Sequence, residues 1–247
     1  MRRPSSPRSP LAVAALALGL LAALLLLVAG PGTRVGLWHF STGFQLLRWG
    51  AYVGVVAIVV SLAAAWLTRP GHGRGGFALA LLGLGLGLVA VGVPWSWRQK
   101  ARSVPPIHDI STDTENPPQF VAIAPLRQDA PNPIEYGGPQ IAAQQRTAYP
   151  DVRPLVLEMP PRDAFRRALD VTQQMGWELV AADTAALRIE ATDRTAWFGF
   201  YDDVVIRITP VTQERAVVDV RSLSRVGGSD VGANAERIRK FLQRLRR

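Results

Sequence analysis

The chain has 247 residues, no cysteine and a formal net charge of +9, with a pI near 11.0. The lack of cysteine excludes disulfides, thiolate metal sites and cysteine nucleophiles. The charge is uneven, because the first 97 residues hold seven arginines and no acidic residue, whereas the rest holds 21 basic and 19 acidic residues. The excess therefore flanks apolar segments and does not form a basic surface interleaved with aromatics, so we expect no nucleic-acid partner.

Three uncharged stretches are long enough to cross a bilayer, which takes about 20 apolar residues per helix. They cover about residues 11–30, 49–67 and 77–97. Tryptophans bracket the second stretch and end the third, where amphipathic rings prefer the membrane interface. Gly83 and Gly87 in the third stretch are spaced for a close approach by another helix. The sequence thus predicts a membrane domain of three spans over residues 1–97, with the lipid bilayer as its partner.

The first span has a basic flank of Arg2, Arg3 and Arg8, as a cleaved signal peptide would. Its apolar run is longer than usual for a signal peptide, and cleavage after Gly30 would place a proline beside the cut, so we expect an uncleaved helix. Five basic residues flank the spans on each side, so their number does not decide the orientation. Because the first span usually dominates and long domains translocate largely regardless of charge, we expect a cytoplasmic N-terminus and a periplasmic C-terminal domain on a bacterial inner membrane.

Residues 98–154 contain ten prolines between Val104 and Pro154. Such a composition is typical of an extended, semi-rigid arm without a core of its own. The segment also includes the apolar patch Phe120–Leu126. We therefore expect the arm to lie along the surface of the domain that follows.

The arm contains one histidine, His108, followed by Asp109 and Asp113. These side chains could supply a metal ligand or a general base, but one histidine with carboxylates at this spacing matches no zinc site. Short polar side chains in this order are more typical of turns. We therefore expect no metal and no cofactor, and we expect Asp109, Ser111, Thr112 and Asp113 to cap and turn the chain.

Residues 155–247 have the pattern of an α+β domain. A short strand at residues 155–159 precedes a helix from Pro161 to about Met175, which has one apolar face. A final helix starts near Asp230. The order predicts one small antiparallel sheet with two helices on one side. Further strands are expected at residues 177–181, 187–192, 196–211 and 215–224.

The last two strands predict which of their side chains face the core. Their even positions are apolar, so these positions point inward, and Asp202, Ser222 and Ser224 share that face. A turn near Thr212 places Asp202 opposite Ser222, or opposite Ser224 if the register shifts by two residues.

The odd positions of the same strands carry charges of both signs. In the first register Asp203 pairs with Arg221, and in the second Arg207 pairs with Asp219. Such cross-strand pairs are common on solvated sheet faces. We expect this face to be exposed, with Arg221 as a surface partner of Asp203.

An inward carboxylate must find hydrogen-bond donors or shift its pKa. We expect Asp202 to find donors at the end of the sheet and in the first turns of the last helix. One interpretation is structural, with Asp202 joining the sheet to that helix. The other is a polar pocket in which the helix N-terminus and arginines bind an anionic group. The candidate binding residues are Asp202, Ser222, Ser224, Arg225, Asn234 and Arg237, with His108 and Asp109 closing over them.

Four blocks of sequence, IHDISTDTENPPQF, YPDVRPL, FGFYDDVVIRI and VDVRSLSRVGGSDVGANAERI, carry a resemblance to a known family. They resemble the successive signature blocks of the bacterial family called domain of unknown function 1499, over roughly Pro105 to the C-terminus. Family members similar to this chain carry an N-terminal membrane region or an export signal, which implies an exported domain. The family has no established activity, so the resemblance implies no catalytic residues.

The sequence leaves three functions open. The first is a periplasmic α+β binding or envelope-interaction module on an inner-membrane anchor, without covalent chemistry, whose partner is an anionic small molecule or an envelope protein. The second is a hydrolase or transferase for an anionic substrate, for example a lipid-derived one, with Asp202 or His108 as base. The third is a structural partner of another membrane protein through the glycine-rich span. Motifs of P-loop nucleotide-binding proteins, zinc peptidases and serine hydrolases are absent, which favours the first.

Overall fold

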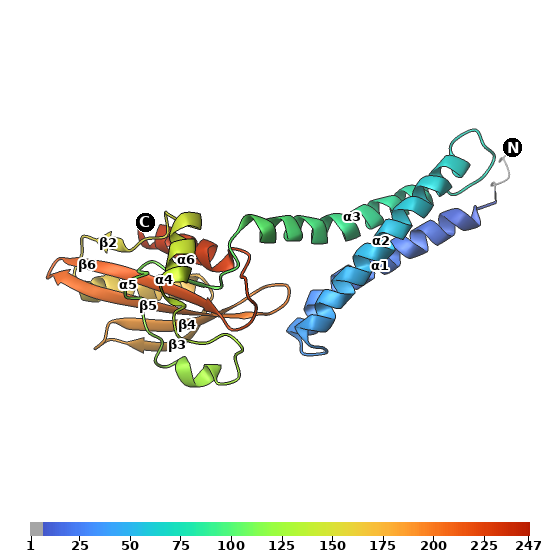
Figure 1. The fold of residues 1–247 in the computed structure, drawn as a ribbon. Helices are drawn as coiled ribbons and strands as arrows, with labels where there is room; N and C mark the ends of the chain where they lie inside the picture. The colour runs from blue at the N-terminus through green and yellow to red at the C-terminus, as the bar shows by residue number, and fades with distance from the viewer. Residues whose placement is uncertain (1–6) are drawn as a thin grey trace. The chain divides into compact units, whose positions relative to one another are not determined.

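The computed structural model describes residues 7–247 (Figure 1), so Arg2 and Arg3 of the basic N-terminal flank lie outside the described residues. The chain divides into two compact units. One contains Met1–Gln99 together with the short loop Ala196–Gly199. The other contains Lys100–Thr195 and Phe200–Arg247.

The first unit contains three helices, α1 (Pro10–Arg34), α2 (Phe40–Thr68) and α3 (Phe77–Ser103). Each is long and apolar enough to cross a membrane, which confirms the three apolar helices predicted from the sequence. The helices extend beyond the apolar stretches. The largest extension is at α2, where the imidazole of His39 accepts a hydrogen bond from the backbone N–H of Ser41 and caps the helix.

Glycines allow the three helices to approach closely. A Cβ atom on Gly83 would lie 2.6 Å from the carbonyl oxygen of Ala15 in α1, and one on Gly87 would lie 2.9 Å from that of Gly54 in α2. Side chains there would therefore separate the helices, as expected where small residues form the contact. The predicted close approach is thus made within the chain, and these two glycines are already used by α1 and α2.

The second unit is an α+β domain, as predicted, built on one antiparallel sheet in the order β1-β6-β5-β4-β3, with β2 also paired to β6. β5 (Tyr201–Thr212) begins five residues later than the strand predicted at residues 196–211, because residues 196–200 form a loop. In chain order the elements are β1 (Asp109–Ser111), the 3-10 helix η1 (Ala124–Arg127), α4 (Gly138–Ala148), β2 (Leu155–Leu157), α5 (Pro161–Gln174), β3 (Glu178–Asp183), β4 (Arg188–Arg194), β5 (Tyr201–Thr212), β6 (Arg215–Ser224) and α6 (Ala233–Leu245).

The register between β5 and β6 is the second of the two predicted alternatives. Asp202 lies opposite Ser224, and Arg207 lies opposite Asp219. The guanidinium of Arg207 donates to the Asp219 carboxylate at 2.9 Å. The register therefore agrees with the predicted inward position of Asp202.

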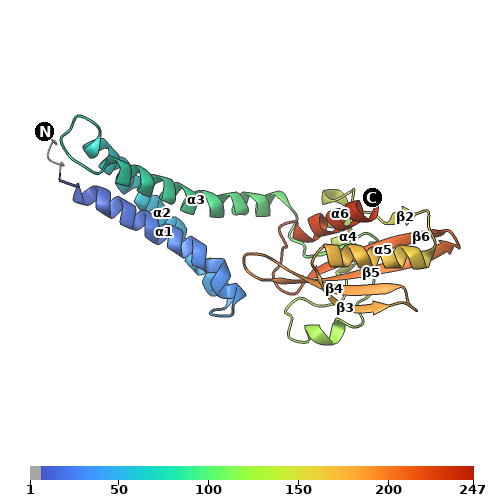
Figure 2. The ribbon, with the colours of Figure 1, turned by 180° about the vertical axis from the view of Figure 1, so that it is seen from behind.

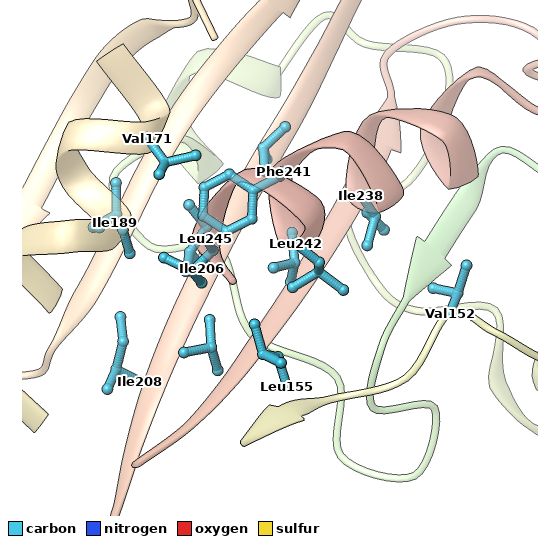
Figure 3. Packing of buried hydrophobic residues seen from close by; sticks show 14 of the residues in the cluster. Val152, Leu155, Val171, Ile189, Ile206, Ile208, Ile238, Phe241, Leu242 and Leu245 are labelled. Carbon is cyan, nitrogen blue, oxygen red and sulfur yellow. The ribbon is translucent and has the colours of Figure 1, made fainter. Parts of the chain in front are cut away.

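Helices α5 and α6 cover one face of the sheet, which we call the helix face; they lie behind the sheet in Figure 1 and in front of it in Figure 2. The main hydrophobic core fills the space between them and the sheet (Figure 3). Ile206 and Phe241 are fully buried there, and Phe241 stacks on Trp177 with ring centroids 5.5 Å apart. The even-numbered positions of β5 and β6 thus face the core, as their apolar pattern predicted.

The opposite face of the sheet, which we call the arm face, is covered by residues of the proline-rich arm. Phe120 and Ile123 of the arm form a second, smaller core with Val205 and Leu223. The prediction of a solvent-exposed face is therefore wrong. Asp203, Asp219 and Arg221 on this face are buried, and Arg207 is half-buried.

The arm itself is more regular than its composition suggested. Asp109–Ser111 forms strand β1 on β6 instead of a turn, and α4 follows later in the arm. The side-chain amide of Gln145 in α4 covers the free edge of β1, because it accepts from the N–H of Ser111 and donates to its carbonyl. Of these residues only Asp113 makes the expected turn. Its carboxylate accepts from the backbone N–H groups of Glu115 and Asn116, two and three residues further on.

Candidate functional site

Five of the eight predicted site residues meet where β5 begins, β6 ends and α6 starts. They are Asp202, Ser222, Ser224, Asn234 and Arg237, and all five are buried. We call them the Arg237 cluster. The strand residues face inward because of their even positions, and the helix residues lie on the first turns of α6.

The start of α6 is held by Asp230. Its carboxylate accepts from the N–H of Gly232 at 2.8 Å and from the N–H of Asn234 at 2.7 Å. These are N–H groups at a helix start, which have no partner within the helix. Burial raises the pKa of Asp230, although the two N–H groups act in the opposite direction. Asp230 is thus a capping residue that positions Asn234.

Arg237 is the centre of the cluster. Its guanidinium donates to Asp202 at 2.6 Å, to Asp193 at 2.8 Å and to the hydroxyl of Ser222 at 3.2 Å. It also donates to the side-chain oxygen of Asn234. One arginine therefore joins β4, β5, β6 and α6.

Asn234 completes the network. Its amide nitrogen donates to the hydroxyl of Ser224 at 3.0 Å and to the carbonyl of His108 at 2.8 Å, and its oxygen accepts from Ser222 at 2.7 Å. Both ends of the amide are therefore engaged. A fully connected buried network of this kind is rigid and specifies one packing of the helix on the sheet.

His108 takes part through its backbone and not through its ring. Its carbonyl also accepts from the N–H of Ser224, which extends the pairing of β1 with β6. The imidazole is half-buried, and its Nδ1 is buried without a hydrogen-bond partner. The imidazole of His108, which the sequence offered as a general base, therefore has no hydrogen-bond partner within the cluster.

Two predicted site residues lie on the arm face instead. Arg225 donates to both oxygens of Asp203 at 2.9 and 2.8 Å. Asp109 lies opposite Leu223, an odd position, and so shares the arm face with Arg221. The predicted group of eight residues is therefore wrong for Arg225 and Asp109, because the sheet separates them from Asp202.

Arg221 is fully buried and is not a surface partner of Asp203. It makes two parallel hydrogen bonds to Asp109, at 2.9 and 2.8 Å, and donates to the carbonyls of Pro118 and Ile134 in the arm. Burial raises the pKa of Asp109, and the hydrogen bonds from Arg221 oppose that effect. Burial also raises the pKa of the neighbouring Tyr136 to about 12.

Glu190 of β4 was not recognised from the sequence. Its fully buried carboxylate accepts from three successive backbone N–H groups of the arm, at Val121, Ala122 and Ile123. Arg188 donates to it at 2.9 Å. Asp193 was also missed, although the pairing of β4 with β5 places it opposite Asp202. The pairing of β4 with β5 was the one signal from which Asp193 could have been found. The sequence holds no such signal for Glu190.

The geometry describes what these residues can do. In the Arg237 cluster the Asp202 carboxylate and the Asn234 amide have protein partners, and the contacts join secondary-structure elements. Among residues 7–247 no group of three or more His, Asp or Glu side chains is arranged to hold a metal ion. One shallow groove of the domain lies elsewhere, between Pro105 and α4, and contains no member of the cluster.

Comparison with known proteins identifies a family but no activity. No curated protein matches the chain. Among solved structures, the di-domain ARO/CYC BexL from the BE-7585A biosynthetic pathway is 16% identical with a TM-score of 0.30, a value too low to support any inference. The match covers 38% of this chain. This chain spans less than half of that protein, 43% of its length. The family described as "Protein of unknown function (DUF1499)" matches residues 109–245, from β1 to the end of α6. Because this match covers more than half of the chain and includes every strand of the sheet, the protein belongs to the DUF1499 family.

Proposed function

We propose that this protein is a non-catalytic binding or envelope-interaction module, displayed by an inner-membrane anchor on the periplasmic side. The observation that carries the proposal is the state of the Arg237 cluster. Asp202 is buried and accepts from Arg237, and the rest of the cluster is used to attach α6 to the sheet. Groups committed in this way stabilise a scaffold, so we assign binding to the surface of the domain.

The periplasmic side rests on sequence arguments. The three apolar helices support membrane association. An odd number of spans, with a cytoplasmic N-terminus, places the α+β domain across the membrane. Its partners would then be the bilayer itself and an anionic molecule or an envelope protein, and not nucleic acid.

Reporter fusions after Arg247 test the location. We expect activity from a reporter that functions only in the periplasm, and none from one that functions only in the cytoplasm. A fluorescent cytoplasm-only reporter would contradict the periplasmic placement.

The role of the cluster is tested with Asp202→Asn in the full-length protein. We expect faster hydrogen exchange at the start of α6, since the charge-assisted hydrogen bond to Arg237 is weakened. We expect no change in molecules retained by the protein in native mass spectrometry. A small molecule that is lost from the variant while hydrogen exchange stays unchanged would show that the cluster is a ligand site, and the non-catalytic proposal would then have to be abandoned.

A further inference from the structure

We propose that the outer surface of α5 and α6 docks on anionic phospholipid headgroups of the membrane that anchors the chain. The proposal rests on the proposed function, because it names a partner for the displayed domain. Four properties of the domain support it: an unequal distribution of charge, unpaired arginines, an acidic opposite face and a short tether.

The two helices of the helix face are strongly basic. Residues 161–174 and 233–247 together contain nine basic and three acidic residues, although residues 98–247 as a whole are nearly balanced at 21 against 19. Of the nine, Arg237 is buried in the cluster described above. The other eight lie on the exposed or half-buried sides of α5, α6 and the tail.

Most of these arginines have no carboxylate partner. In the described part of the chain, Arg162, Arg167, Arg246 and Arg247 make no salt bridge, and Arg244 donates only to the carbonyl of Gln174. The guanidiniums of the domain interior, by contrast, are paired with carboxylates. Guanidinium groups that are free at a surface suit phosphate oxygens, which they bind with two parallel hydrogen bonds.

The opposite side of the sheet has the reverse charge. Residues 107–137 of the arm contain five acidic residues and one arginine, Arg127, which is buried against Asp203. The arm exposes Glu115, Asp129 and Glu135. The domain is therefore electrically polar across the sheet, and an anionic surface attracts the outer surface of α5 and α6 while it repels the outer surface of the arm.

The tether keeps the domain near the bilayer. Exposed Trp95 and Trp97 of α3 are typical of the membrane interface. Six helical residues follow them, about 9 Å of helix. Only Val104–Pro106, roughly 11 Å when extended, then separate α3 from Ile107, the first buried residue of the domain. Such a short connection gives the headgroups a high effective concentration, so individually weak contacts suffice.

The test uses the full-length chain in lipid nanodiscs, and the absence of natural cysteines makes site-specific labelling direct. A fluorophore is attached at Gln243→Cys, on the exposed side of α6, or at Gln128→Cys, an exposed position of the arm. Quenching by a headgroup-labelled lipid is measured in phosphatidylcholine discs with and without phosphatidylglycerol.

We expect quenching at position 243 to be roughly twofold or more greater in the anionic discs, and to decrease as salt rises. Position 128 should not respond. Reversal of three unpaired charges, Arg162→Glu, Arg167→Glu and Arg246→Glu, should abolish the response at position 243. Hydrogen exchange of β5 shows that the triple variant is folded.

Equal quenching of position 243 in both kinds of disc, or an equal response at position 128, would overturn the docking surface. A response that survives the triple reversal would do the same. The reporter fusions decide the side of the membrane separately, so a failure of docking leaves the membrane-anchored module standing, and a failure of the periplasmic placement leaves the docking test valid.

Discussion

The two faces of the sheet are covered in different ways. On the helix face, two amphipathic helices bury a large apolar core, and the buried charged groups described there gather at one end, around Arg237. On the arm face, a segment with little regular structure covers a small core, and buried charges hold it in place. Three contacts do so: Arg221 with Asp109, Glu190 with backbone N–H groups, and Arg127 with Asp203.

The difference follows from how the helices and the arm each find hydrogen-bond partners for their own backbone N–H and C=O groups. A helix hydrogen-bonds its own N–H and C=O groups, so apolar side chains suffice to attach it. An irregular segment has unpaired backbone groups, and these need partners from the sheet. The Glu190 carboxylate and the Arg221 guanidinium supply such partners to the arm. The arm face should therefore depend on single charged residues, whereas the helix face should tolerate conservative apolar changes.

The largest expected effect is from Arg221→Met. The change leaves the buried carboxylate of Asp109 without its cation, so the free energy of unfolding should fall by about 3–5 kcal/mol. Chemical denaturation of the purified protein in detergent measures the loss, and hydrogen exchange of residues 109–137 locates it.

The matched control on the helix face is Ile206→Val, which removes one buried methyl group and should cost about 1 kcal/mol. The added change Asp109→Asn should restore part of the stability of the Arg221→Met variant. If Arg221→Met costs no more than Ile206→Val, the two faces do not differ as described.

A smaller effect is expected from Glu190→Gln. The neutral amide keeps one oxygen acceptor but turns an NH2 group toward the N–H groups of Val121–Ile123, so about 2 kcal/mol should be lost, as for hydrogen bonds to a charged group. Hydrogen exchange should accelerate at these three amides. Glu178→Gln on the exposed side of β3 serves as control and should change little, and similar exchange in both variants would argue against the role of Glu190.

The smallest effect is a pH dependence that is expected at Asp230. Because burial raises its pKa in the folded protein above the ordinary value of 3.8, the folded state binds more protons than the unfolded state between these two pKa values. This carboxyl group therefore makes the protein less stable as pH rises through that window. In Asp230→Asn, which keeps one of the two oxygens that accept at the helix start and so lowers stability at every pH, that pH-dependent loss should disappear.

Asp151 provides a comparison of opposite sign. Its hydrogen bond from Arg239 lowers its pKa, so its contribution is present above 3.8 and is lost as pH falls through its folded pKa. Denaturation of both Asn variants from pH 3 to pH 7 measures the two slopes. Equal slopes for the two substitutions would contradict the assignment of Asp230 as a buried, destabilised carboxylate.

Much of the architecture could be predicted from local patterns. The three apolar stretches become α1, α2 and α3, because uncharged runs of that length have few alternatives to a helix. The alternation in β5 and β6 correctly oriented Asp202, Ser222 and Ser224, since side chains on a strand alternate between its faces. The meeting of Asp202 with Asn234 and Arg237 also followed, because only eight residues separate the end of β6 from the start of α6.

The sequence by itself therefore determined the three long apolar helices, the strands apart from β1 and the start of β5, and the inward face of the sheet. Only the tertiary structure decided what covers the other face. Arg221 and Asp203 at odd strand positions fit a solvated face as well as a buried one, since charges are stable in water or when paired. The partners that make burial possible, Asp109, Arg127 and the N–H groups beside Glu190, are far away in sequence or belong to the backbone. No local pattern contains such partners, and so the sequence predicts a semi-rigid arm along the domain surface and an exposed charged face, and not a buried layer of the fold.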